Sequence, residues 1–305
     1  MLVDLFAGAG GFSRGFVEEG FEVVAAVENF KPVAETYRLN FDAEVIEKDV
    51  KLVTGRDIER ICGDVEVLIG SPPCEPFTAA NATRFAKASD RLYVDKRGQL
   101  TLHFVRLVKE LKPKVFVMEN VPGILDVREA LIREFRKAGY DVHFNVLRAE
   151  DYGNPSKRKR VFISNFKISP EPSKKNPRVI DAIGDLVELS DDVPNHRAEK
   201  LTRDVRNLKW GESLVSFEGA RGRYRNYVRL HPYRPAPPVM GHSRFVHPFV
   251  DRLLSVREHA RLMGFPDDHV FAGGLRVQYS MVGEAVPVPL ARAVAREVKR
   301  ILRTL

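Results

Sequence analysis

Cysteine is scarce in this chain, whose 305 residues include two cysteines and one tryptophan. Two cysteines cannot build the disulfide framework of a small secreted domain, so we expect free thiols in a reducing compartment. The eight histidines are scattered, and no group of His and Cys has the spacing of a zinc site. The sequence therefore predicts no metal centre.

Long apolar runs are missing as well. No stretch reaches the length that crosses a bilayer, and the first residues are typical of a strand and a glycine turn, not of a basic leader with an apolar core. We expect a cytoplasmic, monomeric protein without a membrane partner. Its length allows one large domain or two of ordinary size.

Acidic residues are absent from one segment, Gly219–Phe245, which carries six arginines interleaved with three tyrosines. Guanidinium groups suit phosphate contacts and aromatic rings suit stacking, so this segment predicts a nucleic-acid-binding surface. The net charge of +8 agrees with a polyanionic partner. An ordinary solvated face, which would normally mix both signs, is the alternative. The arginines are Arg221, Arg223, Arg225, Arg229, Arg234 and Arg244.

The first 50 residues have the pattern of a nucleotide-binding fold. A predicted strand, Leu2–Phe6, runs into a glycine-rich turn and a helix, and a second predicted strand ends at Glu28. Glycines let a ligand approach the backbone near a helix N-terminus, and a carboxylate 20 residues after Gly8 can accept hydrogen bonds from ribose hydroxyls. Because Ser13 stands where the dinucleotide fingerprint has its third glycine, the pattern indicates an adenosine-containing cofactor more than a nicotinamide. A purely structural strand–turn–helix is the alternative.

The stretch Val65–Thr78 holds the most reactive candidate. A short apolar strand ends in Gly-Ser-Pro-Pro, and Cys74 follows. Prolines fix φ, so the thiol is held rigidly at the strand tip, where open α/β sheets bind their ligands. Cys74 is therefore either a nucleophile or a small packed hydrophobe, and we interpret Cys62 as a packed structural thiol.

Four further segments indicate chemistry or domain organisation. Glu75–Gly98 is polar and without an apolar period, which predicts a long loop and a candidate lid. A predicted strand, Val115–Met118, places Glu119 at its tip before a rigid turn, and Ser156–Arg160 is strongly basic. Lys167–Asn176 is rich in proline, serine and lysine and is typical of a domain boundary.

In this order the motifs resemble those of the cytosine-5 DNA methyltransferases, which use S-adenosylmethionine. The resemblance spans Leu2 to Arg296. It is carried by Asp4–Phe12, Ser71–Cys74, Asp95–Leu100, Glu119–Val121, Tyr152–Pro155 with Arg158 and Arg160, Arg257–Asp267 and Gly283–Pro287. The chain departs from the usual family residues at Asn29, Glu75, Ser156 and Glu284.

The resemblance implies methylation of C5 of cytosine in double-stranded DNA, with the target base flipped out of the duplex. Cys74 is then the nucleophile that adds to C6, Glu119 bonds N3, and Arg158 or Arg160 bonds O2. The implied cofactor-binding residues are Asp4, Phe6, Ala7, Gly8, Gly10, Gly11, Phe12, Glu28, Asn29, Asp49, Val50, Pro72, Glu284, Ala285 and Val286. Arg97 joins the six arginines as a candidate DNA contact.

The expected fold is α/β, a doubly wound Rossmann-like methyltransferase sheet with a smaller irregular DNA-recognition domain. Residues 1–166 and 276–305 form the predicted catalytic domain, and residues 167–275 the recognition domain. A tRNA cytosine-5 methyltransferase of the same family and a non-catalytic DNA-binding module on this fold are the alternatives. The recognised DNA sequence, and a cognate restriction endonuclease as partner, stay open.

Overall fold

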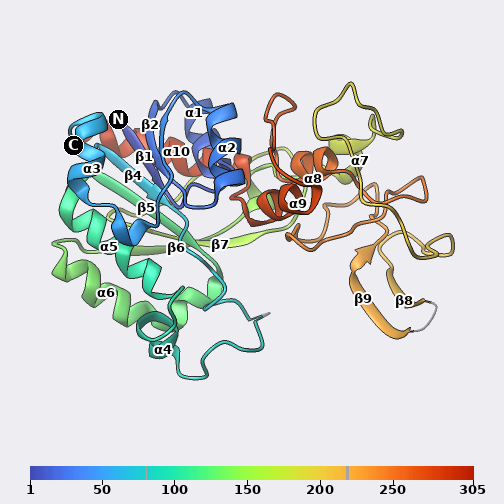
Figure 1. Cartoon of the computed structure of the whole chain (residues 1–305), viewed down its shortest axis with the longest axis horizontal. Coiled ribbons are helices and arrows are strands. Elements are labelled where there is room, and N and C mark those ends of the chain that lie inside the picture. Colours follow the sequence, from blue (N-terminus) through green and yellow to red (C-terminus); the bar gives the residue numbers. More distant parts are fainter. Residues whose placement is uncertain (80, 218–219) are drawn as a thin grey trace. The chain divides into compact units, whose positions relative to one another are not determined.

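A computed structural model describes residues 1–79, 81–217 and 220–305, with the side chains of 215–217 and 220–225 outside the description. The chain forms two compact units (Figure 1). The sheet unit comprises Met1–Arg148, Lys159–Glu171 and Ala291–Leu305, and the second unit comprises Ala149–Arg158 and Pro172–Leu290. The functional domains expected from the sequence, with boundaries near 166 and 276, stay a prediction.

The sheet unit is built on a seven-stranded sheet in the order β3-β2-β1-β4-β5-β7-β6. Neighbouring strands from β3 to β5 pair in parallel, whereas β7 runs antiparallel to both β5 and β6. The prediction of a doubly wound α/β sheet is confirmed. The strands are β1 (Leu2–Leu5), β2 (Val23–Val27), β3 (Glu44–Ile46), β4 (Val67–Gly70), β5 (Val115–Asn120), β6 (His143–Arg148) and β7 (Lys159–Ser164).

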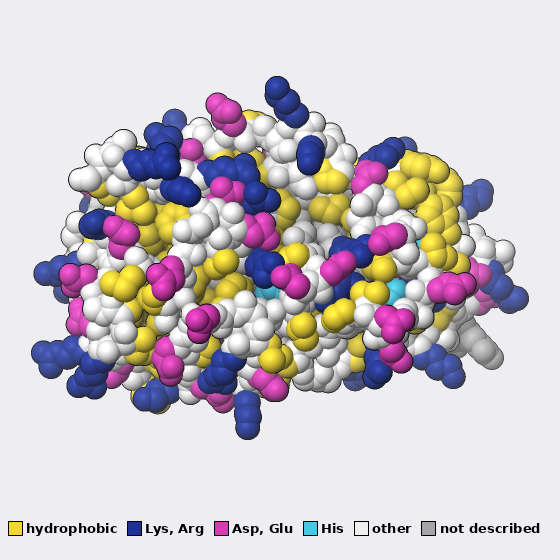
Figure 2. Space-filling view, turned by 90° about the horizontal axis from the view of Figure 1, so that it is seen from above, with side chains coloured by type: hydrophobic (Ala, Val, Ile, Leu, Met, Phe, Trp, Pro, Cys, Tyr) yellow, Lys and Arg dark blue, Asp and Glu magenta, His cyan; other side chains and the backbone are white. Residues whose placement is uncertain are grey.

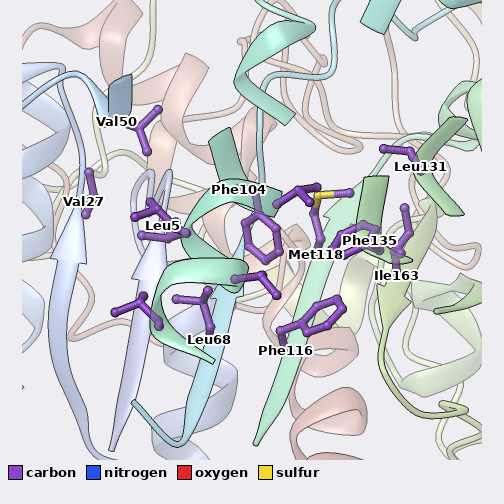
Figure 3. Close-up of a cluster of buried hydrophobic side chains, with 14 of the residues drawn as sticks. Leu5, Val27, Val50, Leu68, Phe104, Phe116, Met118, Leu131, Phe135 and Ile163 are labelled. Carbon is purple, nitrogen blue, oxygen red and sulfur yellow. The ribbon is translucent and has the colours of Figure 1, made fainter. Parts of the chain in front are cut away.

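Alternation along the strands sends side chains into two apolar layers. Val3 and Leu5 of β1 belong to a core that includes Phe104, Phe116 and Phe135, and the last two rings stack with their centroids 5.0 Å apart (Figure 3). The helices of the sheet unit are α1 (Gly11–Glu18), α2 (Lys31–Asn40), α3 (Gly55–Cys62), α4 (Ala88–Tyr93), α5 (Gln99–Leu111) and α6 (Arg128–Lys137), with the 3₁₀ helices η1 (Val50–Leu52) and η2 (Pro122–Val127).

The C-terminal helix α10 (Val288–Leu302) packs on α1 from Ala291 onward. A Cβ added to Gly15 of α1 would lie 2.4 Å from the Cβ of Ala291, so a side chain there would force the two helices apart. Glu19, just after α1, pairs with Arg292 and Arg296 of α10, each at 3.0 Å. The last helix therefore lies against the first helix of the same unit.

Chain order reverses at β1 and β4, which are adjacent in the sheet. The chain moves from β1 to β2 and β3 on one side, and from β4 to β5 on the other. Ligands of open α/β sheets bind beyond the carboxyl ends of the strands at such a switch point. The glycine turn after β1 and the Cys74 turn after β4 both leave the sheet here.

The second unit contains shorter elements. They are η3 (Ala149–Tyr152), α7 (Val179–Ile183), β8 (Ser213–Phe217), β9 (Ala220–Val228), α8 (Val256–Leu262) and α9 (Leu275–Glu284). Helix α8 begins directly after Ser255. The reason is a capping box, in which the Glu258 N–H donates to Ser255 Oγ and the Ser255 N–H donates to Glu258 Oε2.

The structure corrects the prediction that Glu75–Gly98 is loop throughout, because α4 lies within it. Across the described part of the chain, no helix has the length and apolarity needed to cross a membrane.

Candidate active site

The turn after β1 is strained in the way that glycine tolerates. Gly8 and Gly10 have φ of +56° and +82°, and Phe6 has φ of +56° although it carries a side chain. A Cβ on Gly10 would lie 2.2 Å from a ring carbon of Phe41. A left-handed backbone at a non-glycine residue is costly, and such residues cluster at ligand sites. We therefore interpret this turn as a candidate ligand-binding turn.

Glu28, at the end of β2, is tied to this turn. Its Oε2 accepts the Gly8 N–H and its Oε1 accepts the Phe30 N–H, both at 3.0 Å. Burial raises the pKa of the carboxyl group, while the backbone hydrogen bonds oppose that rise. A carboxylate oxygen can accept more than one hydrogen bond, so Glu28 can still bind hydroxyl groups beside the glycine backbone.

Asp4 lies inside the sheet unit and is 1% exposed. Ser13 Oγ donates to Asp4 Oδ2 at 2.6 Å and lies 2.6 Å from the Tyr37 hydroxyl. Burial raises the pKa of Asp4 to about 7, the Ser13 hydrogen bond lowers it and the charge of Glu28 raises it. Asp4 Oδ1 has no hydrogen-bond partner among the described residues.

Other predicted cofactor residues have local structural roles. Phe12 is buried edge-on to Phe16 and Phe162, and Val50 belongs to the apolar core. Asp49 caps η1 by accepting the Lys51 N–H at 3.0 Å. The Ala7 N–H donates to the Val27 carbonyl, and the Ala7 carbonyl accepts the Gly10 N–H. Gly11 begins α1, and Asn29 is exposed.

Cys74 follows β4 in a closed turn. Its carbonyl accepts the N–H groups of Phe77 at 3.0 Å and Thr78 at 2.9 Å, and Cys74 is half-buried. Cys62 differs, since it is buried, its thiol donates to the Ile58 carbonyl at 3.3 Å, and burial raises its pKa. A thiolate is the reactive form, so Cys74 is the thiol of this pair that is accessible for chemistry.

Glu119 lies on the strand beside β4. In the register Gly70 pairs with Met118, so Glu119 and the Cys74 turn leave neighbouring strand ends. Arg160 of antiparallel β7 contacts Glu119, with Nε 2.8 Å from Oε1 and side-chain exposures of 15% and 8%. A nearly buried carboxylate paired with a guanidinium is thus held two strands from the glycine turn.

Arg158 has a different position from Arg160. It belongs to the second unit, where its NH1 donates to the Val239 carbonyl at 2.6 Å and its backbone N–H donates to Glu150. Of the two arginines predicted to be catalytic, the structure brings Arg160 to Glu119.

Asn120, within the Glu119–Val121 motif, is a further candidate site residue that was not predicted. Its Nδ2 donates to the Pro72 carbonyl at 3.0 Å, and its Oδ1 accepts the Val121 N–H at 2.9 Å. The side chain thus connects the turn before Cys74 with the strand end that carries Glu119. An amide directly after the acidic residue at a strand end was the available signal.

Two departures from the family pattern lie in the second unit. Ser156 is buried, donates from Oγ to the Leu262 carbonyl at 2.8 Å and accepts from Asn154 at 2.9 Å. Glu284 is the last residue of α9, and Ala285 and the buried Val286 follow it. The cofactor contacts predicted for Glu284, Ala285 and Val286 stay predictions.

The candidate DNA-binding arginines fall into separate classes. Arg234 is exposed, and Arg97 has half of its side chain exposed with Asp95 3.6 Å away. Arg229 is 7% exposed and bonds Asp251 and the carbonyls of His247 and Val205.

Arg244 forms a bidentate pair with Glu199 and lies 4.3 Å from the Tyr279 ring centroid. Arg229 and Arg244 therefore stabilise the interior of the second unit. The side chains of Arg221, Arg223 and Arg225 lie outside the described ones. On the face drawn in Figure 2, basic and acidic side chains are interspersed.

The sequence matches the family described as C-5 cytosine-specific DNA methylase over residues 1–300. The chain belongs to this family. A Methanocaldococcus jannaschii relative named "Putative type II methyltransferase M.MJ0563P" is 46% identical over 311 residues, with 99% of each chain covered. The Fusobacterium nucleatum "Type II methyltransferase M.FnuDI" is 34% identical, with 99% of this chain and 94% of the relative covered.

Solved structures agree with this membership. An E. coli protein described as a "putative DNA modification methyltransferase" encoded within a prophage superposes with a TM-score of 0.78 at 26% identity, over 99% of both chains. Entamoeba histolytica EhMeth, at 15% identity and a TM-score of 0.70, shares the fold. Among the described residues of this methylase, no group of His, Cys, Asp and Glu could hold a metal ion.

Proposed function

We propose that this protein transfers a methyl group from S-adenosylmethionine to C5 of cytosine in double-stranded DNA. The observation that carries the proposal is the pairing of two neighbouring strand ends. A half-buried Cys74 follows β4, and the Glu119–Arg160 ion pair lies at the end of β5. Membership in the C-5 cytosine-specific DNA methylase family supports the same reaction.

S-adenosylmethionine fits the turn after β1. Gly8 leaves open space beside its backbone, and Glu28 accepts the Gly8 N–H next to that space. Glu28 is proposed to bind the ribose hydroxyls. When bound, S-adenosylmethionine supplies an electrophilic methyl group on its sulfonium sulfur.

Cys74 makes the cytosine ring reactive. Its thiolate adds to C6, a C–S bond forms, and the electron pair of the C5–C6 double bond makes C5 a carbon nucleophile. After C5 is methylated, a base removes the C5 proton, the C5–C6 double bond reforms and the thiolate leaves. The enzyme thiol is therefore regenerated in each turnover.

Glu119 and Arg160 are proposed to act on the opposite edge of the ring. Negative charge develops at N3 and O2 as sulfur adds to C6. The Glu119 carboxyl group is proposed to share a proton with N3 through a hydrogen bond, and Arg160, which pairs with this carboxyl group, is proposed to stabilise charge at O2. None of these atoms is accessible within a base pair stack, so the target base must leave the duplex.

DNA contact is proposed for the exposed Arg234 and Arg97, and for Arg221, Arg223 and Arg225. Since the relatives are named type II methyltransferases, we also propose that a restriction endonuclease with the same target sequence accompanies this protein. The enzyme is proposed to act as a monomer.

The test is mass spectrometry of nucleosides from plasmid DNA incubated with the protein and S-adenosylmethionine. We expect 5-methylcytosine from wild type and from Cys62→Ser, the matched control, and none from Cys74→Ser. N4-methylcytosine, or methylation by Cys74→Ser, contradicts the proposal. Product on tRNA alone indicates an RNA enzyme, and no product from either nucleic acid indicates a binding module.

A further inference from the structure

A buried arginine, Arg91, holds the segment after Cys74 in place. Arg91 lies in α4 and its side chain is 8% exposed. Its Nε donates to the Phe85 carbonyl at 2.7 Å and its NH2 to the Ala86 carbonyl at 3.1 Å. Its NH1 donates to Asp126 Oδ2 at 2.7 Å. A buried cation needs such partners, so these contacts fix its position.

Asp126 belongs to η2, the turn that follows Glu119. Arg91 therefore connects the chain that continues from Cys74 with the chain that continues from Glu119. Asp126 has half of its side chain exposed, so burial does not force its carboxylate to have a charged partner. The guanidinium group bonds its three acceptors through three different nitrogen atoms. A lysine side chain has a single nitrogen and cannot reproduce this arrangement.

A second contact region joins the same two segments closer to Cys74. Asn120 donates to the Pro72 carbonyl, and the Phe77 carbonyl lies so near Gly123 that a Cβ there would be 2.0 Å from it. Arg84 NH1 also donates to the Phe77 carbonyl at 3.1 Å. Because the Phe77 N–H bonds the Cys74 carbonyl, a shift of η2 would reach the nucleophile turn.

The backbone of α4 is also tightly packed. A Cβ on Gly98, just before α5, would lie 1.7 Å from the Arg91 carbonyl oxygen. The backbone of Arg91 is thus packed against the start of α5, while its side chain extends to η2. Arg91 spans two fixed points of the sheet unit.

We propose that Arg91 is a positioning residue that, through Asp126, fixes the position of the Cys74 turn relative to the Glu119 strand end. This inference rests on the proposed function, because their relative position matters only if the two groups act on one base. Displacement of reacting groups by about 1 Å costs roughly 100-fold in rate, so loss of the connection should slow chemistry without affecting cofactor binding.

The experiment measures single-turnover transfer of tritiated methyl groups to plasmid DNA with enzyme in excess, together with S-adenosylmethionine affinity and thermal melting. Arg91→Lys should slow transfer roughly tenfold or more, and Asp126→Asn by roughly threefold, with cofactor affinity unchanged. The double variant should be no slower than Arg91→Lys, because both changes remove one connection. Lys87→Ala is the control, since Lys87 lies in the same segment with 76% of its side chain exposed.

Transfer at the wild-type rate by Arg91→Lys overturns the inference, as does multiplicative slowing in the double variant. A lower melting temperature with an unchanged rate assigns Arg91 a structural role only, which also overturns it. If Arg91→Lys fails to fold, Asp126→Asn decides alone, with a wild-type rate as the contradicting result. Absence of methyl transfer by the wild type refutes the proposed function and is distinguishable from all of these.

Discussion

Replacing Asp4 with asparagine should change how the stability of the sheet unit depends on pH. Asp4 is buried, its pKa is raised from 3.8 to about 7, and burial is the largest cause. Between these two pH values the folded chain holds a proton that the unfolded chain releases. Folding stability from this group is therefore fully present below about pH 4 and is lost as pH rises through 7.

The magnitude follows from the shift. A rise from 3.8 to about 7, at about 1.4 kcal/mol per pKa unit, amounts to roughly 4 kcal/mol. Asparagine does not titrate, so the variant lacks this loss. The asparagine NH2 group would take the place of Asp4 Oδ1, which has no hydrogen-bond partner among the described residues. An unpaired buried donor lowers the free energy of unfolding by roughly 1–3 kcal/mol at every pH. Relative to wild type, Asp4→Asn should thus gain stability as pH rises from 4 to 8.

The assay is urea unfolding followed by circular dichroism at half-unit steps from pH 4 to 8.5. Contributions from the histidines and other carboxylates are largely shared by the two proteins, and the comparison removes them. Asp64→Asn, at an exposed position, is the matched control and should show a constant difference from wild type. A difference for Asp4→Asn that is constant with pH, or that falls as pH rises, refutes the reasoning.

Three further predictions concern other parts of the chain. Gly10→Ala should cost roughly 1–3 kcal/mol more than Gly139→Ala in urea unfolding, because both have positive φ but only the Cβ at Gly10 would meet a ring carbon, at 2.2 Å. Arg234→Ala should lower the salt slope of DNA binding by roughly one unit without changing S-adenosylmethionine affinity, and an unchanged slope would make Arg234 a solvated residue. Burial lowers the pKa of His259 from 6.5 to about 4, so the second unit should lose stability as pH falls from 6.5 toward 4. Fluorescence of Trp210, the single tryptophan, reports this, and stability that rises on acidification would contradict it.

Where an apolar run was clear, the sequence predicted the element closely. The strand expected at Leu2–Phe6 is β1, Leu2–Leu5, and all four of its residues are buried. Helix α4 was not predicted because its position depends on the polar contacts of Arg91, which leave no apolar period.

The arginines show why site prediction from composition is incomplete. The segment Gly219–Phe245 has no acid, which suggested that its arginines face DNA. Yet Arg229 pairs with Asp251 and Arg244 with Glu199, both acids from outside the segment. Partners 22 and 45 residues away are brought in by the tertiary fold, and a local pattern cannot indicate them.

The candidate catalytic groups were easier to predict, because rigid turns and strand ends constrain them locally. Cys74 and Glu119 were selected from prolines and strand tips, and the sheet register relates them as neighbours. The pairing of Arg160 with Glu119 depends on the antiparallel arrangement of β5 and β7, which was not evident from the sequence.

The most direct measurement is covalent trapping on duplex DNA that contains 5-fluorocytosine at the target position. Fluorine cannot leave C5 as a cation, so the bond from Cys74 to C6 should persist after methyl transfer. The account predicts an adduct that requires S-adenosylmethionine, survives denaturing electrophoresis and maps to the Cys74 peptide, with none from Cys74→Ser. An adduct on Cys62, or turnover of the fluorinated DNA without any adduct, would contradict it.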